Sequence, residues 1–346
     1  MSEPLPKPLT QPSLEPPFVS VLVAARNEAD TLGDCLTALT RLDYPTESYE
    51  VLIGNDQSTD ETAFVAMRFV AQNPHVHLID IQSQPTVAPP RLNGKANVLA
   101  QLAQQARGDV LCITDADVRV PPSWLTGLLA EFGPNTGIVT GTTLVQGASF
   151  WARIQAIDWL LAFGLIQLAT YLRLPLTGSG NNMAVRREAY EAVGGFAGLP
   201  FSVVEDYTLF QAVVANGYGH AHRLRPDVLA ETLPTPTLGT YLQQRKRWMQ
   251  GAFSLPIPLL SGVLFQYLLV PILLIVALFA PKTALFIYLA KWLFQTGVAF
   301  WTLQRTHQPH RWPDVFLYEP CQIGLGTLSF LYYLLPIPVR WKGRAY

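Results

Sequence analysis

The chain is short of charge and of cysteine. Lys, Arg, Asp and Glu make up 14% of its 346 residues, against about 25% in an average soluble domain. The formal net charge is only −1, so the chain has no basic footprint for a polyanion and we expect no nucleic-acid partner. Cys35, Cys112 and Cys321 lie far apart without a C-x-x-C pair, which argues against a disulfide framework and against a zinc site. The sequence also contains no G-x-x-x-x-G-K-[ST] loop and no serine nucleophile elbow.

Hydrophobic residues are abundant and unevenly placed, reaching 49% of the chain. Residues 1–251 carry 23 acidic and 17 basic residues, whereas residues 252–346 carry two and seven. The second part contains three apolar stretches, at about 259–280, 283–303 and 315–336, each near the ~20 residues that a membrane-spanning helix needs. We therefore expect an α-helical membrane domain over residues 252–346, with two or three spans in contact with lipid and a short basic tail. The third stretch contains Glu319 and Pro320, so the sequence leaves its crossing open.

The start of the chain is polar and rich in proline. Residues 1–17 lack the apolar run of a signal peptide, and we interpret them as a disordered leader on the cytoplasmic side. The apolar stretch 157–170 is expected to be a core or membrane-surface helix, because acidic motifs before and after it have to meet on one side of the membrane. The sequence thus predicts an integral protein of a bacterial-type inner or plasma membrane with a cytoplasmic catalytic domain.

Strand-like and helix-like segments alternate through the first half of the chain. Apolar, β-branched runs lie at 18–25, 49–55, 75–81 and 109–115, and stretches with helical spacing at about 28–42, 60–72 and 95–107 separate them. This alternation predicts an α/β domain with a mostly parallel sheet covered by helices on both faces. In such sheets ligands bind beyond the carboxyl ends of the strands, so the residues that follow each strand are the candidates for a site.

Polar motifs occupy these positions. They are Arg26-Asn27-Glu28, the segment 55–60 that contains Asp56, Asp115-Ala116-Asp117, Glu205-Asp206, and Gln244-Arg245-Lys246-Arg247-Trp248 on an expected helix. Each motif alone has a structural explanation, such as a helix cap or a charge at a helix terminus. Their order along the chain is what indicates a common site.

The Q-x-x-R-W match at Gln244, Arg247 and Trp248, preceded by Glu205-Asp206 and by the D-x-D of Asp115 and Asp117, resembles family 2 glycosyltransferases of the GT-A fold. The similar branch is the membrane-bound one, with cellulose, chitin and hyaluronan synthases and ceramide glucosyltransferases. The resemblance covers about residues 18–251. It implies a GT-A catalytic domain over these residues, a nucleotide-sugar donor with UDP as the expected nucleotide, and Mg²⁺ or Mn²⁺ as cofactor.

The donor side of the expected site is rich in carboxylates. A diphosphate that gains negative charge as the sugar leaves requires a cation, and hard divalent ions are held by carboxylates and phosphate oxygens. The resemblance implies Asp117 as the stronger metal ligand, with Asp115 as a second ligand or a contact to the ribose. It also places Glu28 and Asp56 near the nucleobase and ribose. Lys95 is either a contact to the diphosphate or a solvated lysine.

The acceptor side requires one general base, because direct attack of a hydroxyl on the anomeric carbon is a single displacement with inversion. We predict Asp206 for this role, with Glu205 orienting a neighbour or capping the following helix. Arg247 offers a guanidinium fork for the diphosphate, and Trp248 offers a ring face to a sugar or an anchor at the membrane interface. Gln244 lies one turn before Trp248 on the same helical face.

The sequence therefore predicts a membrane-bound, inverting hexosyltransferase with a lipid-linked or oligosaccharide acceptor, in the synthesis of cell-envelope polysaccharide or glycolipid. A processive polysaccharide synthase is the alternative, since Q-x-x-R-W occurs in both kinds of enzyme. An inactive membrane scaffold that binds a nucleotide sugar is an alternative of another class. The sequence identifies no protein partner.

Overall fold

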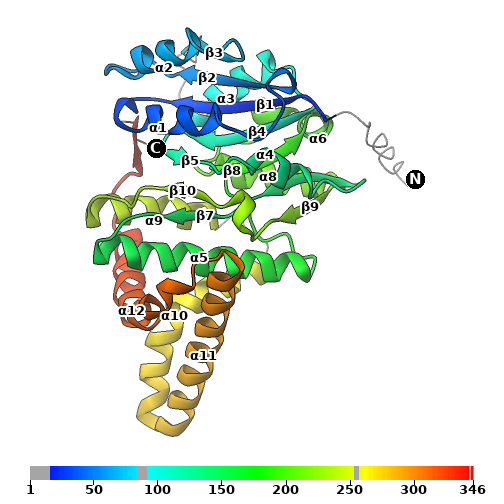
Figure 1. Ribbon diagram of the computed structural model, residues 1–346. Helices are drawn as coiled ribbons and strands as arrows, with labels where there is room; N and C mark the ends of the chain where they lie inside the picture. The colour runs from blue at the N-terminus through cyan, green and yellow to red at the C-terminus, as the bar shows by residue number, and fades with distance from the viewer. Residues whose placement is uncertain (1–15, 84–91, 253–256, 343, 346) are drawn as a thin grey trace. The chain divides into compact units, whose positions relative to one another are not determined.

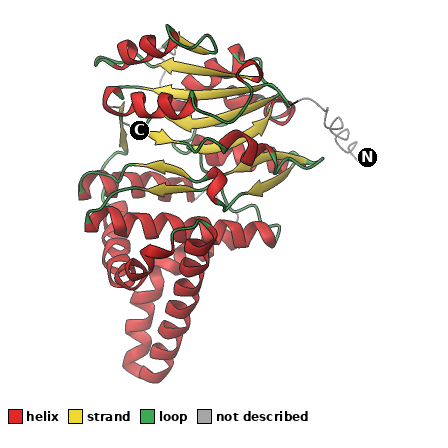
Figure 2. Cartoon of the chain, viewed as in Figure 1, coloured by secondary structure: helices red, strands yellow, loops and turns green. Residues whose placement is uncertain are grey.

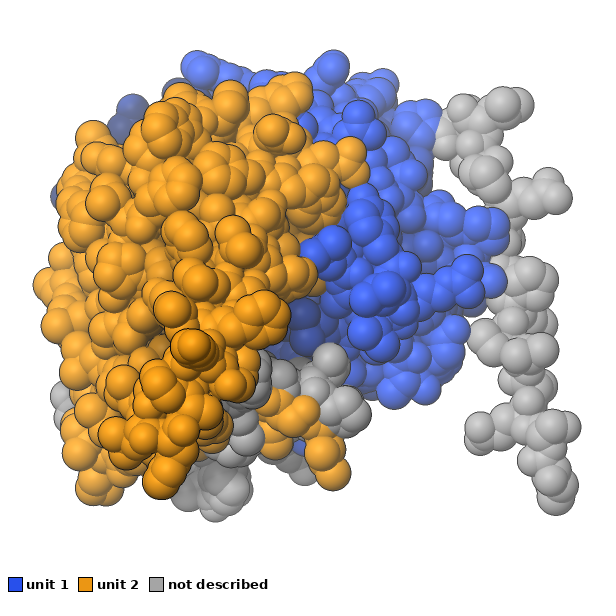
Figure 3. Space-filling model, turned by 90° about the horizontal axis from the view of Figure 1, so that it is seen from below, with its two compact units in different colours: residues 1–144, 166–232 blue, residues 145–165, 233–346 orange. Residues whose placement is uncertain are grey.

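The computed structural model of the protein describes residues 16–83, 92–252, 257–342 and 344–345, so almost all of the expected leader lies outside the described residues. The chain divides into two compact units, Met1–Leu144 with Ile166–Thr232 and Val145–Leu165 with Leu233–Tyr346 (Figure 3). The sequence predicted a division after residue 251, whereas the structure groups residues 145–165 and 233–251 with the C-terminal part. Both segments form helices whose polar side chains pair with the last helix of the chain.

The first unit is built on a seven-stranded sheet of order β3-β2-β1-β4-β8-β6-β9 (Figure 1). The strands are β1 Val19–Ala25, β2 Tyr49–Asn55, β3 Val76–Asp80, β4 Val110–Asp115, β6 Thr136–Thr140, β8 Asn182–Arg186 and β9 Gly219–His222. The first four pair in parallel, as the alternating pattern predicted. β8 is antiparallel to both β4 and β6.

Helices cover both faces of this sheet (Figures 1 and 2). They are α1 Ala29–Leu39, α2 Thr62–Val70, α3 Gly94–Gln105, α4 Trp124–Leu129, α6 Arg187–Ala192, α7 Gly195–Gly198 and α8 Glu205–Ala215. Because side chains alternate along a strand, β1 sends Val21 into a core with α1 and α4, and Leu22 into a second core with α3 and α8. Burial on both faces explains why these strands read as continuous apolar runs.

A small three-stranded sheet of order β5-β10-β7 completes this part of the fold. Its strands are β5 Val118–Arg119, β7 Thr143–Val145 and β10 Ala230–Thr232. β5 follows directly on the D-x-D turn, and it pairs antiparallel with β10. The position of Asp117 is therefore fixed by β4 before it and by β5 after it.

The second unit is helical (Figures 1 and 2). Its helices are the greater part of α5 Phe150–Tyr171, α9 Leu238–Ala252, α10 Ile257–Phe279, α11 Pro281–Arg305 and α12 Trp312–Leu334. A short hairpin of β11 Arg340–Trp341 and β12 Arg344–Ala345 follows. α12, at the third apolar stretch whose crossing the sequence left open, is one helix with Pro320 inside it.

Two helices of the described residues are long and apolar enough to cross a membrane, α5 and α11, and α10 contains a shorter apolar run, Leu268–Phe279. The two long helices differ in burial, because 56% of the apolar window of α5 is buried within the protein and only 17% of that of α11. Of the two expectations for residues 157–170, a core helix and a membrane-surface helix, the burial of α5 fits the core helix.

Candidate active site

The carboxyl ends of β1, β2 and β4 lie side by side. Ala25 at the end of β1 pairs with Asn55 of β2, and Ala24 pairs with Asp115 of β4. The loops that carry Glu28, Asp56 and the D-x-D motif thus leave the sheet at neighbouring positions. This convergence is what the strand pattern predicted.

The loops after β1 and β2 are joined by hydrogen bonds. Arg26 donates from Nη1 to the backbone carbonyl of Asp56 at 2.7 Å and lies 3.7 Å from its carboxylate, which is almost completely buried. Asn27 adopts a left-handed conformation with φ 52°, and its side-chain oxygen accepts from the backbone N–H of Thr59 at 2.8 Å. These contacts leave little freedom to the carboxylate of Asp56.

Glu28 stands at the N-terminus of α1. Its backbone carbonyl accepts from Leu32 at 2.9 Å, and its carboxylate accepts from the Thr31 hydroxyl at 3.2 Å. Glu28 therefore does place a negative charge at the N-terminus of a helix, as its structural explanation proposed. The same helix reaches the D-x-D motif, because the Cys35 thiol donates to the backbone carbonyl of Asp115 at 3.5 Å; burial and the charges of Asp117, Asp115 and Glu28 raise the pKa of this thiol.

Lys95 lies at the centre of the acidic cluster. It is buried in the first turn of α3 and forms an ion pair with Asp115, and its Nζ lies 3.6 Å from Oε1 of Glu205. Burial acts to lower the pKa of Lys95, but the charges of Asp115, Glu205 and Asp206 outweigh it and raise the pKa. The alternative of a solvated lysine is wrong, because 9% of this side chain is exposed.

The Glu205-Asp206 pair begins α8, and its two carboxylates point to different partners. Glu205 is buried and accepts from Nδ2 of Asn93 at 2.8 Å, while Asn93 caps α3 by accepting from the backbone N–H of Ala96 at 2.8 Å. Asp206 is only half-buried, and its Oδ2 accepts from the backbone N–H of Gly180 at 2.7 Å. Glu205 therefore supports Lys95 and α3, which fits the orienting role predicted for it.

Gly180 is required beside Asp206. A Cβ atom at this position would lie 2.6 Å from the Cβ atom of Asp206, closer than side chains approach each other. The next two residues are anchored elsewhere, since Asn181 accepts from the Ser179 hydroxyl at 2.7 Å and Asn182 accepts from the Trp124 indole at 2.8 Å. The segment before β8 is thus built to present the Gly180 N–H to Asp206.

The D-x-D turn supplies the oxygen ligands that a hard divalent cation prefers. Among the described residues, no group of three or more His, Cys, Asp or Glu side chains could hold a metal ion without other ligands. A cation bound by Asp115 and Asp117 would therefore need further oxygens, as phosphates and water provide. Asp115 would share its carboxylate with Lys95. The residues present fit a metal that arrives with a diphosphate.

The Q-x-x-R-W residues lie on α9 in the second unit. Trp248 packs against Trp159 of α5 with ring centroids 5.6 Å apart, and the guanidinium of Arg245 lies 4.4 Å from the Trp248 centroid. Gln244 has a buried side-chain oxygen without a hydrogen-bond partner among the described residues, and Arg247 is half-buried. Arg245 and Trp159 thus cover part of the Trp248 ring, for which the sequence offered either a contact to a sugar or an anchor at the membrane interface.

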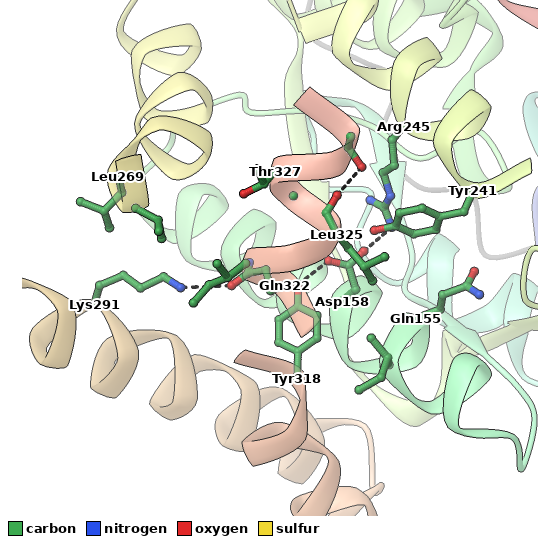
Figure 4. A pocket seen from close by; sticks show the side chains of 15 residues that line it. Gln155, Asp158, Tyr241, Arg245, Leu269, Lys291, Tyr318, Gln322, Leu325 and Thr327 are labelled. Carbon is green, nitrogen blue, oxygen red and sulfur yellow. Dashed lines mark hydrogen bonds and ion pairs between the residues drawn. The ribbon is translucent and has the colours of Figure 1, made fainter. Parts of the chain in front are cut away.

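The second unit also holds polar residues inside its helical bundle. Lys291 of α11 donates to both carboxylate oxygens of Glu319 of α12, at 2.8 and 3.0 Å, and to Gln322 at 3.1 Å. Lys291, which lies in the middle of a long apolar helix, therefore has protein partners. Lys291 and Gln322 line a cavity of about 70 Å³ together with Asp158 and Arg245, while Leu269 contributes to its apolar wall (Figure 4).

Comparison with known proteins identifies the class. A mannosyltransferase from Pyrobaculum calidifontis, solved in complex with GDP-Man and Mn2+, superposes with a TM-score of 0.58 at 20% sequence identity, covering 88% of this chain and 87% of that one. The two proteins share a fold, the GT-A fold that the motifs implied. The sheet with its acidic strand ends thus has the fold of the GT-A class.

The sequence model of glycosyl transferase family 21 matches residues 5–346, and the chain belongs to this family. The predicted resemblance to GT-A glycosyltransferases is confirmed. The matching family is family 21, whereas the motifs had pointed to family 2. Beta-monoglucosyldiacylglycerol synthase of Nostoc sp. is 27% identical over 69% of this chain and 49% of its own length. Poly-beta-1,6-N-acetyl-D-glucosamine synthase of Staphylococcus aureus is 29% identical over 67% of this chain and 54% of its own. The chain spans about half the length of these curated relatives.

Proposed function

We propose that this glycosyltransferase moves a sugar from a nucleotide sugar, with UDP as the nucleotide, to a hydroxyl of a lipid-linked or oligosaccharide acceptor at a membrane. The observation that carries the proposal is the cluster of carboxylates around Lys95 at the carboxyl ends of the parallel strands. Ligands of open α/β sheets bind at this edge. The fold shared with a GDP-Man-binding mannosyltransferase and the two synthases among the relatives support a nucleotide-sugar donor.

The nucleoside and the diphosphate of the donor each have residues that could bind them. Asp56 and Glu28 can accept from ribose hydroxyls or a base N–H. Asp117 and Asp115 would hold Mg²⁺ or Mn²⁺, and such a cation would neutralise the charge that develops on the leaving diphosphate. Lys95, through its contacts with Asp115 and Glu205, keeps these carboxylates in place. Arg247 is the further cation that we assign to the diphosphate.

Asp206 is the proposed general base. In a single displacement, the acceptor oxygen bonds to the anomeric carbon as the bond from that carbon to the diphosphate breaks, and the hydroxyl proton passes to the Asp206 carboxylate. Half-burial leaves this carboxylate accessible, while the Gly180 N–H holds one of its oxygens. An α-linked donor would then give a β-linked product.

The second unit is the proposed membrane and acceptor domain. α10, α11 and α12 expose many large apolar side chains, among them Leu274, Phe279, Phe286 and Leu331, which a lipid environment would cover. The cavity among its helices joins polar groups such as Lys291 and Gln322 to apolar walls, as suits the head of an amphiphilic acceptor. We therefore favour a lipid acceptor and place the catalytic unit in the cytoplasm.

The experiment measures nucleotide release and sugar transfer by the detergent-purified protein with Mn²⁺ across a panel of UDP- and GDP-sugars. Asp206→Asn should abolish transfer and leave donor binding in place, and Asp34→Asn, an exposed carboxylate of α1, is the matched control that should transfer normally. NMR of the product gives the anomeric configuration. A retained configuration, or transfer by Asp206→Asn, would contradict the proposed mechanism.

A processive synthase is the second candidate, favoured by the similarity to poly-beta-1,6-N-acetyl-D-glucosamine synthase. The same assay separates the two, because single transfer gives one glycolipid and processive synthesis gives long products at low turnover. Binding of a nucleotide sugar without turnover by any donor would support the inactive scaffold instead.

A further inference from the structure

Arg245, inside the Q-x-x-R-W motif but not one of its defining residues, is held by groups on its own helix α9 and on α5. Its guanidinium forms an ion pair with Asp158 of α5 and lies over the rings of Tyr241 and Trp248, with carbon-to-centroid distances of 4.7 and 4.4 Å. Asp158 also accepts a hydrogen bond from the hydroxyl of Tyr318 on α12. Asp158 is thus the link between the motif helix α9 and two other helices of the second unit (Figure 4).

The same turn of α5 also contacts Trp248 directly. Trp159 follows Asp158, and its ring packs against that of Trp248 at an interplanar angle of 59°. A cation over an aromatic ring is attracted by the electrons of that ring, and the attraction grows when water is excluded, as it is for Arg245 with 12% of its side chain exposed. The orientation of Trp248 therefore depends on where Asp158 places the guanidinium.

The neighbouring residues attach α9 to α12. Gln243 donates to the hydroxyl of Tyr332 at 2.7 Å. Lys246 is buried and donates to the carbonyl of Leu335 at 2.6 Å, just beyond the C-terminus of α12. With α9 fastened to α12 in this way, the ion pair and the ring contacts to α5 are the further contacts that hold the face of α9 that carries Trp248.

A second ion pair of α5, this one to α12, offers a comparison. Arg153 of α5 donates from Nε to the carboxylate of Asp314 of α12 at 2.8 Å, about one turn before Asp158 and Tyr318 along each helix. This pair has the same chemistry and involves no residue of α9. If Asp158 served stability alone, the loss of either carboxylate would have equivalent consequences.

We propose that Asp158 is a positioning residue for sugar transfer, which through Arg245 holds Trp248 of the Q-x-x-R-W motif in one orientation. The proposal rests on the function proposed above, with Trp248 in the sugar contact that the Q-x-x-R-W resemblance implies for it. Asp158 acts on the reaction only through Arg245 and Trp248. Because Asp158, Arg245 and Tyr318 also line the cavity of the second unit, a molecule bound there would meet the same three side chains.

The test compares Asp158→Asn with the matched control Asp314→Asn in the full chain in detergent. For both variants we would measure the melting temperature, the KM for the donor, and kcat for transfer. Both should melt at a lower temperature, because each leaves a guanidinium without its carboxylate. Asp158→Asn alone should lower kcat for transfer, by about ten- to a hundredfold, because small misplacements of substrate-positioning groups have effects of this order. The KM for the donor should not change.

Arg245→Lys and Arg245→Met keep the test decisive if Asp158→Asn folds poorly. Lysine retains the charge opposite Asp158 but loses the planar contact with Trp248, so transfer should fall although stability is largely kept. A kcat for Asp158→Asn equal to that of Asp314→Asn, or full activity of both Arg245 variants, would overturn the positioning role while the proposed function stands. Wild-type protein that transfers no sugar would overturn the proposed function, and the positioning role with it.

Discussion

Replacing Lys95 by methionine should destabilise the first unit severely. Methionine fills a similar volume, so the change removes the charge and leaves the packing of α3 nearly intact. Glu205 keeps 7% of its side chain exposed and would become a buried carboxylate without its cation, and Asp115 would lose an ion-pair partner. Removing one partner of a buried pair costs about 3–5 kcal/mol. For a unit of this size, such a loss lowers the melting temperature by roughly 6–20 °C.

The assay is thermal unfolding of the detergent-purified protein in EDTA, so that no cation replaces the ammonium group. Arg119→Met is the control, because Arg119 pairs with Asp34 and Glu231 while 43% of its side chain is exposed. Exposed pairs contribute about 0–1 kcal/mol, so this variant should melt within a few degrees of the wild type. The double variant Lys95→Met with Glu205→Gln should regain part of the loss. Equal melting temperatures for Lys95→Met and Arg119→Met would refute the buried-pair reasoning.

Three further predictions concern the site and the sheet. Gly180→Ala should displace the Asp206 carboxylate and lower kcat by about tenfold or more, which steady-state kinetics would detect; unchanged kinetics would contradict the close approach of these residues. EDTA should abolish transfer and Mn²⁺ restore it, with Asp117→Asn requiring a higher Mn²⁺ concentration, and transfer in EDTA would exclude the metal site. Burial lowers the pKa of His222 to about 3, so this histidine is neutral in the fold and the unfolded chain takes up a proton below about pH 6.5. Stability should be full above that pH and fall by about 1.4 kcal/mol per unit down to about pH 3; His222→Gln should flatten the profile, and an equal slope in the variant would assign it to other groups.

The parallel part of the sheet could be predicted because its strands are buried on both faces. β1, β2 and β4 read as uninterrupted apolar runs, and the polar residues directly after them could only lie at the carboxyl edge. That reasoning placed Glu28, Asp56 and Asp115 together without knowledge of any side-chain contact. The antiparallel strand β8 and the short strands β5 and β10 carry no comparable pattern.

Long-range partners could not be predicted. Asp158 lies 87 residues before Arg245 and 160 before Tyr318, and no spacing rule connects such positions. The sequence left two interpretations of Lys95 open because its burial depends on Glu205, which is far away in the chain. The Q-x-x-R-W residues were found through resemblance to a family, and no pattern in the sequence indicated that Arg245 would cover the Trp248 ring.

The crowding of Asp115, Glu205 and Asp206 around Lys95 has a consequence for how the enzyme would meet its donor. A nucleoside diphosphate is itself an anion, and it approaches a surface that already repels it. Donor and divalent cation should then bind cooperatively, each raising the affinity for the other by the same factor. A cell could adjust the occupancy of this enzyme through its free metal concentration alone, without any change in the supply of sugar nucleotide.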